Sequence, residues 1–183
     1  MIVRRSLGFL LAAQLLLGTG AGAQAPAYNP AAWQEDLRVI AREIPALGAR
    51  RYTLKPGKAS ATGTVTVREN ILSNGLITAV IDRSAGTISS LKGRHGTEFV
   101  KAGEGNGLNQ YLYVPGKDPA KAKPATVTTL EVVEHGPLVG VIRVTSTAPG
   151  CRSLIQEYRV IDGMERVDMV NIMDRENIRE KEA

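Results

Sequence analysis

Residues 126–172 read TVTTLEVVEHGPLVGVIRVTSTAPGCRSLIQEYRVIDGMERVDMVNI, and this stretch decides the fold class. It contains four runs rich in β-branched and aromatic residues: 126–133, 138–147, 153–161 and 165–172. The turn residues Gly136-Pro137 and Asp162-Gly163 separate the first run from the second and the third from the fourth. Strands joined by such short turns pair antiparallel. The stretch therefore predicts two successive β-hairpins.

The chain upstream continues the same pattern. Runs with strand composition occur at 64–68, 76–81, 87–91 and 110–114. Turn residues stand between them, for example at Asn74-Gly75 and over 82–86. No helical pattern is long enough to cover a sheet as in an α/β protein. We therefore expect an all-β fold, an antiparallel β-sandwich.

The N-terminus has the order of a secretory signal peptide over residues 1–23. Arg4 and Arg5 precede an apolar run, and Ala21-Gly22-Ala23 forms a small-residue cleavage site. An uncleaved anchor helix is the alternative, although the apolar run is shorter than the roughly 20 residues that span a bilayer. Residues 24–33 then read as a linker and residues 34–183 as the β-sandwich module. The sequence predicts an exported protein, and the single cysteine, Cys151, favours a bacterial periplasm or exterior.

Charge excludes two classes of partner. Removing Arg4 and Arg5 with the leader leaves 21 basic and 18 acidic residues, a net charge of about +3 that is spread along the chain. Nucleic-acid binding proteins concentrate far more positive charge. A polybasic membrane patch is also missing from the sequence. We expect neither a nucleic acid nor, after signal cleavage, a membrane as partner.

The residues that could perform catalysis form no recognisable set. The two histidines, His95 and His135, lie in turn segments, and Cys151 follows the turn pair Pro149-Gly150. Glycoside hydrolysis needs two facing carboxylates, and the candidates by residue type are Asp82, Glu98, Asp162, Asp168 and Asp174. No spacing pairs any two of them, and none supports a metal site built from His95, Glu98 and Asp82. The residues alone indicate an exported β-sandwich without a visible catalytic set.

Several segments, taken in order, resemble the family 38 glycoside hydrolases, the α-mannosidase family. They cover roughly residues 40–183: Ile44-Pro45-Ala46-Leu47-Gly48 with Tyr52; Glu69-Asn70; Leu76 to Asp82; Gly86 to Leu91; Gly107 to Tyr113; Glu134 to Leu138; and Arg166-Val167-Asp168 with Asn171 and Asp174. This resemblance implies a β-sandwich of the galactose-mutarotase type, here incomplete.

Members of that family remove α-linked mannose by a retaining mechanism, with a zinc ion held by Asp and His residues of an N-terminal β/α domain. Those residues have no counterpart here, because Ala23 is followed almost directly by the sandwich. The resemblance therefore implies a non-catalytic portion of an exported α-mannosidase-like enzyme, with no catalytic residue, no metal ligand and no cofactor in this chain. Its partner would be a glycan or a catalytic glycosidase domain. An incomplete sandwich would also leave sheet edges unpaired, which predicts self-association.

The resemblance carries one site position, Tyr111, whose counterpart reaches toward the bound sugar. Asn109 and Gln110 are its expected hydrogen-bonding neighbours, so these three residues are the predicted substrate-binding set. The alternative is that Tyr111 and Tyr113 pack as ordinary strand aromatics. Two other functions stay open: a stand-alone secreted carbohydrate-binding or adhesion module, and a small complete enzyme that uses acids such as Asp82 and Glu98.

Overall fold

The computed structural model describes residues 40–53, 60–100 and 107–177. The chain divides into two compact units, Met1–Gly57 and Lys58–Ala183. The predicted signal peptide and linker, residues 1–33, lie outside the described residues. In the described part of the first unit, residues 45–48 form a turn in which Gly48 N donates to Pro45 O at 3.0 Å. No helix in the described ranges is long and apolar enough to cross a bilayer.

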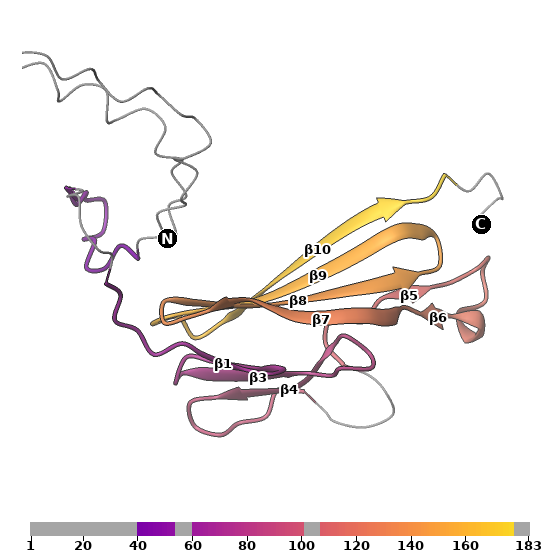
Figure 1. Ribbon diagram of the computed structural model, residues 1–183, viewed down its shortest axis with the longest axis horizontal. Helices are drawn as coiled ribbons and strands as arrows, with labels where there is room; N and C mark the ends of the chain where they lie inside the picture. Colours follow the sequence, from indigo (N-terminus) through magenta and orange to yellow (C-terminus); the bar gives the residue numbers. More distant parts are fainter. Residues whose placement is uncertain (1–39, 54–59, 101–106, 178–183) are drawn as a thin grey trace, which may run out of the picture. The chain divides into compact units, whose positions relative to one another are not determined.

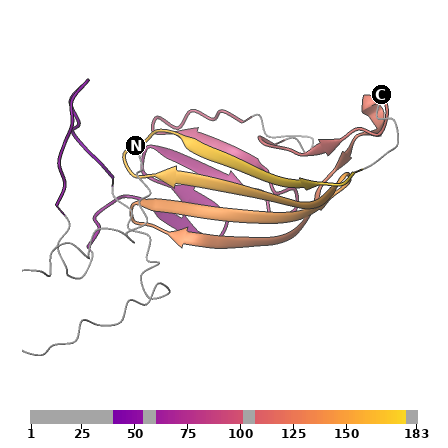
Figure 2. The ribbon, with the colours of Figure 1, turned by 90° about the horizontal axis from the view of Figure 1, so that it is seen from above.

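The second unit contains two four-stranded antiparallel sheets. The smaller sheet has the order β1-β2-β3-β4 and the larger has the order β10-β9-β8-β7. Figure 1 shows the two sheets facing each other, and Figure 2 shows the longer strands lying across the shorter ones. The smaller sheet consists of β1 (Thr66–Arg68), β2 (Ile71–Ser73), β3 (Ile77–Ile81) and β4 (Ile88–Gly93). The larger consists of β7 (Thr126–His135), β8 (Val139–Ala148), β9 (Cys151–Ile161) and β10 (Val167–Arg175).

A third, two-stranded sheet pairs β5 (Leu112–Tyr113) with β6 (Lys123–Pro124). The 3-10 turn η2 (Pro119–Lys121) lies between these two strands, and Asp118 caps it by accepting from Ala120 N at 3.0 Å. Residues 115–124, which are rich in lysine, alanine and proline, therefore contain both this turn and β6.

The core forms because successive residues of a strand point to opposite faces, and the inward faces of both sheets are mostly apolar. In β3 the burial alternates residue by residue, with Ile77, Ala79 and Ile81 buried. The inward side chains of both sheets join one cluster: Leu72, Ala79, Ile81 and Ile88 from the smaller sheet, and Ile142, Val144, Tyr158 and Val160 from the larger. The prediction of an all-β antiparallel sandwich is therefore confirmed. Its assignment to the galactose-mutarotase type stays a prediction.

Side chains join the turns of the two sheets at one end of the sandwich. Thr64 N, just before β1, donates to Asp162 Oδ1 at 2.8 Å. Asn74, between β2 and β3, donates from Nδ2 to Ile161 O at 2.7 Å and to Met164 O at 2.6 Å. Asp162 lies at the turn between β9 and β10, but its carboxylate binds the backbone of a segment 98 residues away.

Candidate functional site

The predicted substrate-binding residues lie in the segment 107–113, which crosses from the smaller sheet to the larger one. Leu108 bridges Ile88 of β4 through two backbone hydrogen bonds, of 3.1 and 3.0 Å. Gly107 must be a glycine, because a Cβ there would lie 2.1 Å from Thr87 Oγ1. The glycine lets the chain pass close to Thr87 and places Asn109 over β9 and β10.

Asn109 makes four polar contacts with the larger sheet. Its backbone has φ of 66°, a left-handed conformation that asparagine tolerates better than most residues. Its side chain exchanges amide hydrogen bonds with Asn171 of β10, at 2.9 and 2.7 Å. Its Nδ2 also lies 3.3 Å from Tyr158 Oη, and its carbonyl oxygen accepts from Gln156 Nε2 at 2.7 Å. Asn109 therefore fixes the crossing segment to β9 and β10.

Tyr111 packs against the end of the β8–β9 hairpin. Its ring contacts a small apolar cluster formed by Ala148, Cys151 and Leu154. Its hydroxyl donates to Pro149 O at 2.6 Å and lies 3.4 Å from Cys151 Sγ. Burial and the Cys151 contact raise the pKa of Tyr111 to about 12. The phenol stays protonated at physiological pH, and its one proton is already donated within the chain.

The structure therefore places Tyr111 and Asn109 on neighbouring parts of one segment but gives them separate partners. Asn109 binds β9 and β10, whereas Tyr111 binds the turn before β9. Gln110 is partly buried between them and has polar contacts of its own. Their role toward a sugar stays a prediction.

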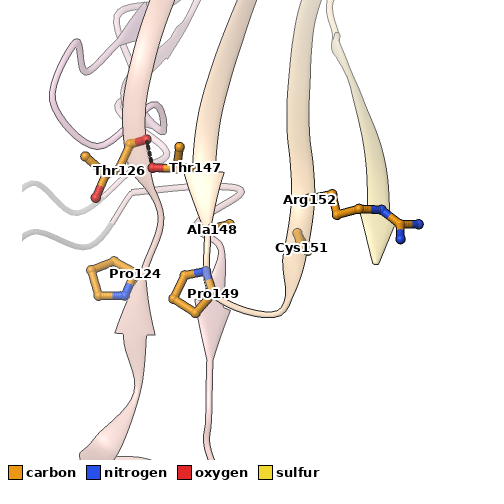
Figure 3. A pocket seen from close by; sticks show the side chains of 7 residues that line it. All are labelled: Pro124, Thr126, Thr147, Ala148, Pro149, Cys151 and Arg152. Atoms are coloured by element: carbon orange, nitrogen blue, oxygen red, sulfur yellow. Dashed lines mark hydrogen bonds between the residues drawn. The ribbon is translucent and has the colours of Figure 1, made fainter. Parts of the chain in front are cut away.

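A pocket of about 310 Å³ opens beside this turn, and Figure 3 shows its lining. The lining residues are Pro124, Thr126, Thr147, Ala148, Pro149, Cys151 and Arg152. No carboxylate is among them, so the pocket holds no general acid or base of the kind that glycosidases use. Its one charged residue, Arg152, forms a bidentate ion pair with Asp174 at 2.8 and 2.6 Å. The pocket is thus a small recess without a carboxylate, and its single charged side chain is already paired.

The five carboxylates that sequence analysis selected by type each have a structural partner. Asp82 accepts hydrogen bonds from Ser84 and Ala85 in its own turn, and the Ser84 hydroxyl bond is the main cause of its lowered pKa. Asp162 binds Thr64, Asp168 pairs with Arg166 at 3.0 Å, and Asp174 pairs with Arg152.

Hydrogen bonds perturb the Glu98 carboxylate strongly. Its carboxylate accepts from the Ser90 hydroxyl at 2.5 Å and from the backbone N–H groups of Leu91 and Val100 at 2.7 and 3.0 Å. These bonds, with Ser90 first, lower the pKa of Glu98 to about 2. A general acid needs a raised pKa. Asp82 and Glu98 are shifted the opposite way, which argues against the small-enzyme alternative.

The histidines and the cysteine lie apart from these carboxylate contacts. His95 is exposed in the turn after β4, and His135 is exposed at the end of β7. Cys151 is buried at the start of β9 beside Tyr111. In residues 40–53, 60–100 and 107–177, no three His, Cys, Asp or Glu side chains come together as a metal site would require.

The sequence predicted no long-range partner for three polar residues that join distant segments in the structure. Asn74, Gln156 and Asn171 carry the contacts between segments, yet each has an ordinary strand or turn environment in the sequence. The only local signal was Asn74-Gly75, which marks a turn but not its distant partners. Comparisons of the chain with models of known protein families, with curated proteins and with solved structures found no match.

Proposed function

We propose that this chain is the non-catalytic β-sandwich portion of an exported α-mannosidase-like glycoside hydrolase, and that it acts by packing against a catalytic domain or by binding glycan. The observation that carries the proposal is the ordered resemblance to that family between residues 40 and 183. Within the second unit, its segments fall in order on the elements of one sandwich. Residues 76–82 form β3, and residues 86–91 lead into and form most of β4.

The later segments continue this order. Residues 107–113 form the crossing segment that contains β5, residues 134–138 span the end of β7 and the turn to β8, and Arg166 to Asp174 cover most of β10. The structural roles of Asp82, Glu98, Asp162, Asp168 and Asp174 support a non-catalytic module.

Activity assays test the non-catalytic part of this proposal. The purified secreted chain should not hydrolyse aryl α-mannosides, with or without added zinc, above the rate of a blank. Turnover above the blank, lost when Asp82 or Glu98 is replaced by its amide, would overturn the proposal in favour of the small-enzyme alternative.

The neighbouring DNA tests the partner. The proposal expects an adjacent reading frame that encodes an aspartate- and histidine-rich β/α domain, and it expects that co-expression yields a complex with α-mannosidase activity. A chain that has no such neighbour and binds mannan alone, measured by affinity electrophoresis against a β-glucan control, would instead support the stand-alone carbohydrate-binding module.

A further inference from the structure

The larger sheet ends in a long strand with one side unpaired within the described structure. The nine residues of β10 pair with β9, and β10 is the last strand in the sheet order. Four of its apolar side chains are between 37% and 52% exposed: Met169, Val170, Ile172 and Met173. They belong to both faces, because Met169 and Met173 register with the core residues Tyr158 and Leu154, while Val170 and Ile172 register with Glu157 and Ile155. Both faces of this edge therefore present apolar surface.

The opposite edge of the same sheet is built differently. β7 has two register irregularities, between Val127 and Thr129 and between Val132 and Glu134. Bulges of this kind stop an edge strand from pairing with another chain. In β10 the single irregularity comes at the end, between Asp174 and Arg175, and the residues before it are regular. Only the β10 edge of this sheet thus keeps the regular backbone that strand addition requires.

We propose that β10 pairs antiparallel with β10 of a second copy, about a two-fold axis through Val170. In this register Val170 lies opposite its own copy, Met169 opposite Asn171, and Val167 opposite Met173. On the outer face, Arg166 lies opposite Asp174 of the second copy, and symmetry repeats this pair. Opposite charges directly across two strands stabilise their pairing. The joined sheet would have eight strands.

Neighbouring registers place like charges opposite each other. An axis through Asn171 would place Arg166 opposite Glu176 but also Asp168 opposite Asp174, and an axis through Ile172 would place Asp168 opposite Glu176. An axis through Met169 would avoid such pairs but would shorten the paired segment by two residues. The sequence of β10 therefore favours the register centred on Val170, which pairs no like charges, and a closed two-fold pair follows from it.

Sedimentation velocity of the secreted chain over a wide concentration range tests this inference. We expect a concentration-dependent dimer. Asp174→Arg should weaken the dimer about tenfold, because it places two arginines opposite each other at two symmetric positions. Arg166→Asp combined with Asp174→Arg should restore the affinity. Arg152 lacks its Asp174 partner in both variants, so the restoration cannot come from that intramolecular pair.

Val170→Lys should abolish the dimer, and Val133→Lys is the matched control, an exposed valine on the bulged β7 edge. Circular dichroism checks that each variant folds; if Val170→Lys does not fold, the charge-swap pair decides. Three results would overturn the proposal: a monomer at every concentration, a double variant no tighter than Asp174→Arg, or open-ended growth in size. If the chain is monomeric, the unpaired β10 edge would instead be a candidate for pairing with a strand of another polypeptide. The inference is independent of the proposed function, because no step in it uses a glycan or a glycosidase.

Discussion

Asn74 uses both ends of its side-chain amide to connect the turns of the two sheets. Its Oδ1 accepts from Leu76 N and Ile77 N at 3.1 and 2.9 Å, which shapes the β2–β3 turn. Its Nδ2 donates to Ile161 O and Met164 O at the β9–β10 turn. The residue is only 2% exposed, so water cannot easily replace these bonds.

Asn74→Ala should lower the free energy of unfolding by about 2–4 kcal/mol, because it leaves buried backbone groups without partners. Urea denaturation monitored by circular dichroism measures the change. Ser73→Ala is the control. It removes one hydrogen bond, between the Ser73 and Thr78 hydroxyls at 2.9 Å, and should lower the free energy of unfolding by less than about 1 kcal/mol. Equal losses in the two variants would show that the contacts of Asn74 between the sheets contribute nothing.

Tyr111 tests, at the same scale, whether a residue that resembles a sugar contact acts in structure. Tyr111→Phe removes the bond to Pro149 O and should cost about 1 kcal/mol of stability. We expect unchanged affinity for mannan, because the hydroxyl is already bonded within the chain. Tyr52→Phe, in the first unit, is the control. A loss of mannan affinity without a loss of stability would instead assign the Tyr111 hydroxyl to the sugar.

At the scale of elements, one polar side chain satisfies backbone N–H groups at the outer edge of the smaller sheet. Glu98 lies beside β4 and accepts from two backbone N–H groups that a longer partner strand would otherwise satisfy. An antiparallel backbone bridge joins Lys92, within β4, to Glu98 on the outer side of this strand. The Glu98 carboxylate thus accepts hydrogen bonds that the carbonyl groups of a neighbouring strand would accept at a paired edge.

The Glu98 carboxylate makes the free energy of unfolding depend on pH in the acidic range. The folded-state pKa of Glu98 is about 2, against an ordinary value of 4.5. A depressed pKa means that the ionised form stabilises the fold, so its contribution is fully present above pH about 4.5 and is lost as the pH falls toward 2. Glu98→Gln should unfold with a weaker pH dependence than wild type in that range.

Urea unfolding of both proteins as a function of pH measures this difference. Glu69→Gln is the matched control, because the Glu69 carboxylate pairs with the exposed Arg83 side chain at 2.8 Å. A Glu98→Gln protein that loses stability as steeply as wild type would contradict the assignment.

At the scale of the whole sandwich unit, the two sheets pack closely at Gly140. Gly140 of β8 faces β1 and β2, and a Cβ there would lie 2.6 Å from Val67 Cγ2 and 2.9 Å from Val65 Cγ1. The glycine lets these valines pack directly against the β8 backbone. Interiors packed this closely leave no room for an added methyl group.

Gly140→Ala should therefore lower the free energy of unfolding by about 1–3 kcal/mol through overpacking. Gly93→Ala on β4 is the control, because its nearest neighbour, at 3.1 Å, is the ring of Phe99, which is 61% exposed and can move. Thermal unfolding of the two variants gives the comparison. A Gly140→Ala protein as stable as the control would show that the sheets can separate without cost.

The sequence by itself determined most of the strands and most of their turns. The alternation of Thr and Val around β1 and the pair Asn74-Gly75 act through neighbouring residues, so local steric and hydrogen-bonding preferences suffice to predict them. The two hairpins of the larger sheet followed for the same reason. β2 was missed, because Ile71-Leu72-Ser73 does not alternate apolar and polar residues as the segment around β1 does.

Only the tertiary structure decided which side chains meet. Asn109 binds Asn171, Tyr111 binds Pro149 and Asp162 binds Thr64, across separations of 62, 38 and 98 residues. Such pairs depend on how two sheets stack and on the register between strands. The sequence of a strand determines which residues share a face, but it does not determine which strand of the other sheet packs against that face.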